Sequence, residues 1–111
     1  MIEIKNETEK VILVGVSLSD QDDTKESLEE LKDLVSTAGA ETVGMVIQNR
    51  EQQHPGTYVG KGKIEELKSM IWELRATGIV CDDELSPAQM KNLQDELDVK
   101  VMDRTLIILD I

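Results

Sequence analysis

The chain has 111 residues, of which 40% are hydrophobic, and its 12 basic and 23 acidic residues give a net charge of −11. This length fits one domain. The charge argues against a protein that binds any polyanion, because unspecific affinity for nucleic acids comes from basic surface, but it does not exclude a local basic site. With one cysteine, no signal peptide and no apolar run of the roughly 20 residues that span a bilayer, we expect a cytoplasmic protein without an internal disulfide.

The first two elements are a strand and a helix. Residues 11–16 (VILVGV) form a short apolar run rich in β-branched side chains, which is typical of a strand buried on both faces. Apolar residues then recur at helical spacing over residues 28–38. Asp23 and Glu26 form an expected capping pair at the start of this helix, and Gly39 is expected to end it.

The same pattern repeats in the middle of the chain. A second strand is expected over residues 43–47, and a long polar loop over residues 48–60. Helical spacing of apolar residues over 64–74 predicts a second helix, which we expect to end at Gly78. Residues 79–81 then form a short third strand.

The last part of the chain has the clearest helix start. Ser86 is expected to be the N-cap of a third helix, with Pro87 at its first position and Gln89 closing a capping box. Residues 99–102 predict a fourth strand at an exposed edge. The apolar residues 106–111 either pack back on the sheet or belong to a longer protein.

Four strands that alternate with three helices predict an α/β fold of three layers. We expect a four-stranded, mainly parallel sheet with helices on both faces and the strand order 2-1-3-4. Trp72 is expected to cover the rim of the core, with a role at an interface as the alternative.

The loop before the second helix is the most unusual segment. Residues 53–64 contain no acidic residue in a strongly acidic chain. Gly60 and Gly62 permit close approach to a backbone that opens a helix, where anions bind, and Lys61 and Lys63 add positive charge. The alternative is a flexible loop whose glycines only fit a turn. The spacing does not match a P-loop, so we expect no nucleotide hydrolysis by that route.

Acidic residues gather at the expected ends of the strands. Asp82, Asp83 and Glu84 could bind a divalent metal together with the acidic residues of the first loop (Asp20, Asp22 and Asp23), but such carboxylates more commonly stabilise helix N-termini. Cys81 is expected to be a small core residue. No catalytic triad forms around His54, so we expect neither a catalytic residue nor a metal site in this chain.

Three segments resemble signatures of the HflX family. Residues 57–67 (TYVGKGKIEEL) resemble its first signature, residues 82–89 (DDELSPAQ) with Asn92 and Leu93 the second, and residues 101–105 (VMDRT) with 108–111 (ILDI) the third. The resemblance covers nearly the whole chain. The family consists of cytoplasmic GTPases that bind the large ribosomal subunit and can split ribosomes under stress.

The resemblance implies that this chain is the N-terminal domain of such a protein. Residues 1–105 would form the domain and residues 106–111 would begin a helical linker, with the GTPase domain and its GTP and magnesium beyond Ile111. This fragment would then be no enzyme and hold no cofactor. Its partners would be rRNA of the large subunit and the GTPase domain, and the apolar C-terminal segment could also mediate self-association. The alternatives are a regulatory module that binds ATP or GTP and a small magnesium-dependent phosphohydrolase.

We expect the basic loop to contact phosphates of rRNA, with Tyr58 stacking on a base. The expected contact residues are Tyr58, Gly60, Lys61, Gly62 and Lys63. The secondary candidates are Arg50, His54, Asp82, Asp83, Ser86 and Arg104.

Overall fold

The protein alternates strands and helices along its length. The computed structural model describes residues 8–19 and 22–110. In chain order the elements are β1 (Lys10–Ser17), α1 (Thr24–Thr37), β2 (Glu41–Asn49), α2 (Lys61–Leu74), β3 (Gly78–Cys81), α3 (Pro87–Leu97), β4 (Lys100–Asp103) and α4 (Arg104–Asp110). All three strand pairs are parallel and the strand order is β2-β1-β3-β4. The predicted α/β sheet and strand order are confirmed, and β4 lies at an edge as expected.

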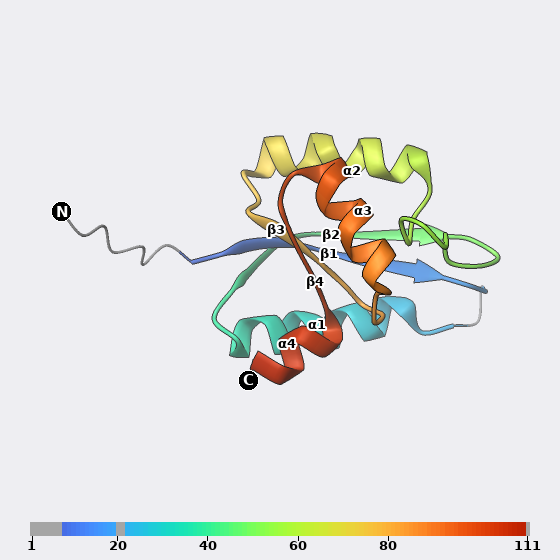
Figure 1. Ribbon diagram of the computed structural model, residues 1–111. Coiled ribbons are helices and arrows are strands. Elements are labelled where there is room, and N and C mark those ends of the chain that lie inside the picture. Colours follow the sequence, from blue (N-terminus) through green and yellow to red (C-terminus); the bar gives the residue numbers. More distant parts are fainter. Residues whose placement is uncertain (1–7, 20–21, 111) are drawn as a thin grey trace.

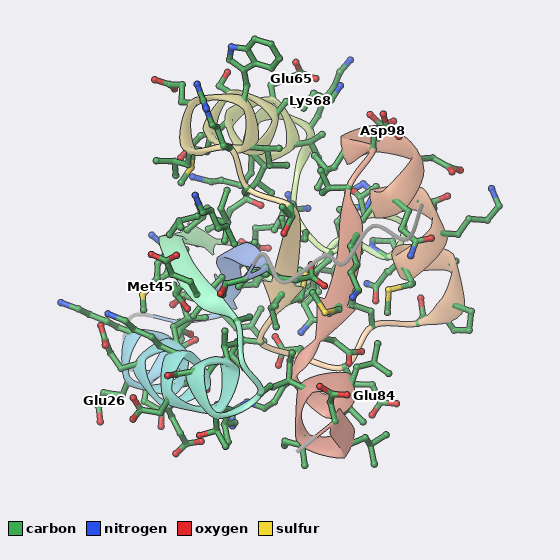
Figure 2. All side chains as sticks on the ribbon, turned by 90° about the vertical axis from the view of Figure 1, so that its left-hand side faces the viewer. Glu26, Met45, Glu65, Lys68, Glu84 and Asp98 are labelled. Atoms are coloured by element: carbon green, nitrogen blue, oxygen red, sulfur yellow. The ribbon has the colours of Figure 1, made fainter. Side chains whose placement is uncertain are left out.

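The sheet is covered on both faces, with α2 and α3 on one side and α1 and α4 on the other (Figure 1). Each face of the sheet has its own hydrophobic core, and alternate side chains of β1 point into one or the other. Ile12 and Val14 pack with α2 and α3, whereas Val11 and Leu13 pack with α1. Such two-sided burial explains why β1 has a continuous apolar run. Figure 2 shows Glu26 and Glu65 on the outer sides of α1 and α2.

The N-termini of α3 and α1 are held differently. The Ser86 hydroxyl oxygen accepts a hydrogen bond from the backbone N–H of Gln89 (3.1 Å), and Gln89 accepts one from the N–H of Ser86, as predicted. The predicted capping pair at α1 is wrong, because the side chain of Asp23 makes no capping bond. Asp22 takes this place and accepts bonds from the hydroxyl (2.7 Å) and N–H (3.3 Å) of Thr24.

The helix α2 does not end at Gly78. It ends at Leu74, and Arg75 adopts the left-handed conformation (φ 56°) that usually falls to glycine. Gly78 instead begins β3, where a Cβ atom would lie 2.7 Å from the carbonyl oxygen of Lys100 on β4. This glycine therefore permits close strand pairing rather than stopping the helix.

Both α4 and α2 carry exposed apolar side chains. Ile107 packs back into the core beside α1, while Leu106, Ile108 and Leu109 stay exposed. Trp72 is 85% exposed, so the expectation that it covers the core rim is wrong. Among the described residues, no helix has both the length and the apolar character that a membrane span requires.

Candidate functional site

The loop between β2 and α2 is a compact turn. His54 and Tyr58 exchange two backbone hydrogen bonds (3.1 and 2.8 Å). The Nδ1 atom of His54 accepts bonds from the N–H groups of Gly56 (3.0 Å) and Thr57 (3.1 Å). His54 therefore shapes the turn.

Two side chains of α3 fix this turn to the domain. Gln89 donates from Nε2 to the carbonyl oxygen of His54 (2.9 Å), and Asn92 donates from Nδ2 to that of Gly56 (2.9 Å). The interpretation of this segment as a flexible loop is therefore wrong.

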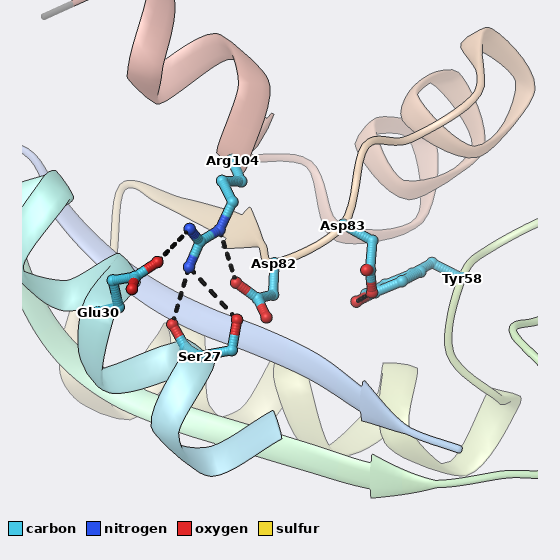
Figure 3. A network of polar contacts seen from close by, with 6 residues as sticks. All are labelled: Ser27, Glu30, Tyr58, Asp82, Asp83 and Arg104. Atoms are coloured by element: carbon cyan, nitrogen blue, oxygen red, sulfur yellow. Dashed lines mark hydrogen bonds and ion pairs between the residues drawn. The ribbon is translucent and has the colours of Figure 1, made fainter. Parts of the chain in front are cut away.

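Tyr58 anchors the loop from inside. Its side chain is fully buried, its φ of 69° lies in the left-handed region, and its hydroxyl donates to Oδ2 of Asp83 (2.6 Å; Figure 3). Burial, together with the carboxylate of Asp83, raises the pKa of Tyr58, which keeps the phenol protonated as a donor. The expected stacking of Tyr58 on a base is wrong, because no face of the ring reaches the surface.

The start of α2 is more restricted than the sequence predicts. The N–H of Gly60 donates to Oε1 of Gln48 (2.7 Å), and a Cβ atom at Gly60 would lie 2.6 Å from Nη1 of Arg50. The ammonium group of Lys63 lies 3.0 Å from the carboxylate of Glu66. Lys61 is exposed and has no ion pair with any residue of 8–19 or 22–110. Of the expected phosphate contacts, the Lys61 ammonium and the backbone around Gly62 thus remain accessible, and the inward-facing amide of Gly60 does not.

A second network joins the carboxyl ends of β3 and β4 to α1. The guanidinium of Arg104 donates to Asp82 (Nε–Oδ1, 3.2 Å), to Glu30 (Nη1–Oε1, 2.7 Å) and to the backbone oxygen of Ser27 (3.0 Å; Figure 3). Asp103 accepts N–H bonds from Leu85 and Leu106 (both 2.9 Å). The secondary candidates Arg104 and Asp82 are therefore occupied by structural contacts.

These contacts interlock the three sequence motifs. Tyr58 of the first motif binds Asp83 of the second, while Arg104 of the third binds Asp82 of the second. The motifs thus build the frame of this edge of the sheet, and Lys61 is a cation that this frame presents to solvent.

Sequence reasoning missed the residues that hold the frame together. Gln48 lies near the carboxyl end of β2, where the alternation of side chains along the strand places it beside the start of α2. Arg50, one of the expected secondary candidates, follows β2 and lies beside the same helix start. The other partners carry no local signal, because their contacts join distant segments: Ser27, Glu30, Gln89 and Asn92.

In the part of the chain that the structure describes, the acidic side chains at the strand ends are not grouped to hold a metal ion. A cavity of ≈ 210 Å³ between the ends of β1 and β3 is lined partly by Asp22, Asp23, Asp82 and Asp83. Within residues 8–19 and 22–110, no group of three or more His, Cys, Asp or Glu side chains is placed to hold an ion, and Asp20 lies outside the described residues. The alternative of a magnesium-dependent phosphohydrolase gains no support.

Cys81 is not placed to act as a nucleophile. It is fully buried in the core, as expected, and burial raises the pKa of its thiol.

Comparisons with known proteins agree with this architecture. The model of the family described as "GTP-binding GTPase N-terminal" matches residues 25–111. The chain is 68% identical over all 111 residues to the GTPase HflX of Lacrimispora saccharolytica, of which it covers 26%. It is 38% identical over 103 residues to the GTPase HflX of Escherichia coli, an alignment that covers 93% of this chain and 24% of that protein.

A solved structure shares the fold. The crystal structure of a GTP-binding protein from the archaeon Sulfolobus solfataricus in complex with GDP matches 91% of this chain and 29% of that chain, with a TM-score of 0.67 and 22% sequence identity. The chain spans about a quarter of the length of the curated relatives named above.

Proposed function

Because the chain belongs to the GTP-binding GTPase N-terminal family and is similar to HflX proteins, we propose that it is the recognition domain of a ribosome-associated GTPase. In this proposal the full-length protein works in the cytoplasm, and its GTPase domain supplies the GTP and magnesium chemistry. The domain described here contributes binding: it contacts rRNA of the large ribosomal subunit through Lys61 and the surrounding loop.

The observation that carries this proposal is the exposed charge of Lys61 on a rigid frame, without an ion pair to any residue that the structure describes. The turn over residues 54–58 is held by α3 and by Asp83, so the position of Lys61 is defined before any partner arrives. The guanidinium of Arg50 lies beside the same helix start. Cations at a helix N-terminus favour phosphate oxygens, because the helix dipole and the free N–H groups act in the same direction.

The net charge of −11 limits how this contact can work. Most of the surface repels RNA, so the affinity depends on a small patch and falls as salt screens it. Binding of the isolated domain to the subunit is therefore expected to be weak and best measured at low ionic strength.

Reversing one charge tests the proposal. Lys61→Glu is expected to weaken binding to purified large ribosomal subunits and to lower the slope of log affinity against log salt by about one unit. Cosedimentation across a salt series measures both quantities. Lys32→Glu is the matched control, since Lys32 is an exposed lysine on α1, which covers the opposite face of the sheet from α2. Equal affinity of the two variants and the unchanged chain would contradict the proposal.

The alternative of a nucleotide-binding module has less support from the geometry. It requires the amides and lysines of residues 60–63 to surround phosphates, yet the Gly60 N–H binds Gln48 and Lys63 is shared with Glu66. Calorimetry with ATP and GTP separates the two functions: saturable binding of free nucleotide that Lys61→Glu removes would favour this alternative.

A further inference from the structure

One face of α2 carries a continuous row of exposed side chains. Lys61, Glu65, Lys68, Trp72 and Arg75 follow one another at spacings of four, three, four and three residues, which places them on a single side of a helix. We call these five residues the outer ridge. All five are exposed, and Figure 2 shows Glu65 and Lys68 on the side of α2 that faces away from the sheet.

Trp72 is the most unusual member of the outer ridge. It is 85% exposed, although tryptophan is normally among the more buried residue types. An open groove of ≈ 780 Å³ lies beside it, lined by Ile71, Trp72, Glu73, Arg75 and Ala76. The indole therefore presents a flat apolar surface next to a space that a planar group can enter.

Arg75 holds a second exposed group at this groove. It ends α2 in the left-handed conformation, which glycine would adopt without strain. Its guanidinium has no hydrogen-bond or ion-pair partner among the residues that the structure describes. An unpaired cation thus lies within one helical turn of the exposed indole.

The outer ridge is also the more basic side of an acidic molecule. Together with its cap Arg75, α2 has four basic and three acidic residues, whereas α1 and α3 each have more acidic than basic residues. Lys68 is neutralised by Glu65 (3.2 Å) and Glu96 (3.6 Å), and Lys63 is paired with Glu66. Among the described residues, the cations of this helix and its cap that lack an ion pair are therefore Lys61 and Arg75, at the two ends. They lie about 21 Å apart along the helix, roughly the length of six stacked nucleotides.

We propose that the outer ridge binds a single-stranded segment of RNA, with Trp72 stacking on an unpaired base while Arg75 and Lys61 contact phosphates. The proposal rests on the function proposed above and extends its site from Lys61 along the whole of α2. Aromatic stacking suits any base with a free face, and Arg75 adds charge at the same position.

The surroundings of Trp72 favour RNA over a protein surface. A protein hot spot is normally enclosed by further contacts that exclude water. Here the neighbours on the ridge and in the groove include the charged Lys68, Glu73 and Arg75. One aromatic ring between separated cations matches the alternation of base and phosphate along a single strand.

Fluorescence gives a direct test, because Trp72 is the only tryptophan of the chain. Titration with a ten-nucleotide uridine oligomer at low salt is expected to quench its emission. By filter binding, Trp72→Ala is expected to bind the oligomer about 10-fold more weakly, whereas Trp72→Phe retains most of the affinity. Leu109→Ala, which removes a 75% exposed apolar side chain on α4, on the other face of the sheet, is the control without effect.

A second variant separates binding from folding. Arg75→Gly relaxes the left-handed cap and removes the cation, so it is expected to leave the domain at least as stable while weakening binding of the oligomer. If only Trp72→Ala bound more weakly, partial unfolding of that variant could explain the loss. Weaker binding by Arg75→Gly has no such explanation, because this variant is expected to remain folded.

The outcomes distinguish this proposal from the function on which it rests. Without quenching, and with normal subunit binding by Trp72→Ala and Arg75→Gly, the ridge is no RNA site, even if Lys61→Glu still weakens subunit binding. If Lys61→Glu has no effect on the subunit either, both proposals fall. If Trp72→Ala weakens subunit binding but single-stranded RNA causes no quenching, the ridge contacts a protein and the proposal is overturned.

Discussion

At the scale of single residues, Tyr58 shows how a binding motif can be mostly scaffold. Its ring fills the core between the loop and α3, and its hydroxyl reaches the carboxylate of Asp83. The backbone at Tyr58 is left-handed, which a side chain other than glycine adopts only where the surrounding contacts compensate. Tyr58 therefore sets the path of the chain toward Lys61, and it contributes to binding only through this position.

Removing the hydroxyl of Tyr58 is expected to destabilise the domain. Tyr58→Phe leaves Asp83 without its donor, and a hydrogen bond to a charged group contributes about 1.5 to 3 kcal/mol. Urea unfolding followed by circular dichroism measures the change in the free energy of unfolding. In a double-mutant cycle, Asp83→Ala is expected to cost much less in the Tyr58→Phe background. Fully additive effects would show that the two side chains do not interact.

At the scale of elements, the fold requires different things of Gly62, in the first turn of α2, and of Gly78, at the start of β3. Gly62 lies in the first turn, and a Cβ atom there would meet nothing within 4 Å, so the fold does not require this glycine. Gly78 follows the helix and lies so close to β4 that a Cβ atom would press on backbone. Only the second glycine is demanded by packing, which leaves the first available for close approach of a partner.

Alanine at these two positions is expected to have opposite effects. Gly62→Ala should raise the free energy of unfolding by about 0.5 to 1 kcal/mol, because alanine favours helix, whereas Gly78→Ala should lower it by about 1 to 3 kcal/mol through overpacking. Urea unfolding measures both. If RNA approaches the backbone of the first turn, Gly62→Ala also weakens subunit binding despite its higher stability. A stabilised variant with unchanged binding would exclude such an approach.

At the scale of the whole molecule, the acidic surface makes the response to pH informative. Asp22 and Glu9 have lowered pKa values: Asp22 mainly through the hydrogen bond from Thr24, and Glu9 mainly through the bond from Lys100. A group whose pKa is lower in the folded state stabilises the fold above its unfolded pKa. This contribution is lost as the pH falls through the folded value. Asp22 fixes the β1–α1 turn, so acid is expected to loosen that turn.

The effect of Asp22→Asn should therefore depend on pH. At pH 7 the variant is expected to be less stable than the unchanged chain, because the ionised carboxylate accepts bonds from Ser17, Leu18 and Thr24. Below about pH 4, where the unfolded chain takes up protons, the two stabilities should converge. Urea unfolding at pH 7, 5 and 3 measures the difference, and a constant difference at all three values would contradict this account.

Patterns that depend on neighbours in the sequence were predictable, and those that depend on distant contacts were not. The apolar run of β1 and the capping box at Ser86 are local, so this strand and the start of α3 followed from them. The strand order was expected from the precedent of doubly wound sheets and is confirmed. The expected end of α2 at Gly78 was wrong, because Arg75 takes the left-handed position that ends the helix. Gly78 instead permits the close pairing of β3 with β4, a contact between distant segments. The burial of Tyr58 depends on Asp83, 25 residues away, and no local spacing reveals such a pair.

The rigid turn over residues 54–58 also has a thermodynamic consequence. A segment whose backbone is already fixed gives up little freedom when a partner arrives, so the entropy of association should be dominated by released ions and by the partner's own ordering. Any mutual adjustment of shape would then fall on the partner rather than on this domain.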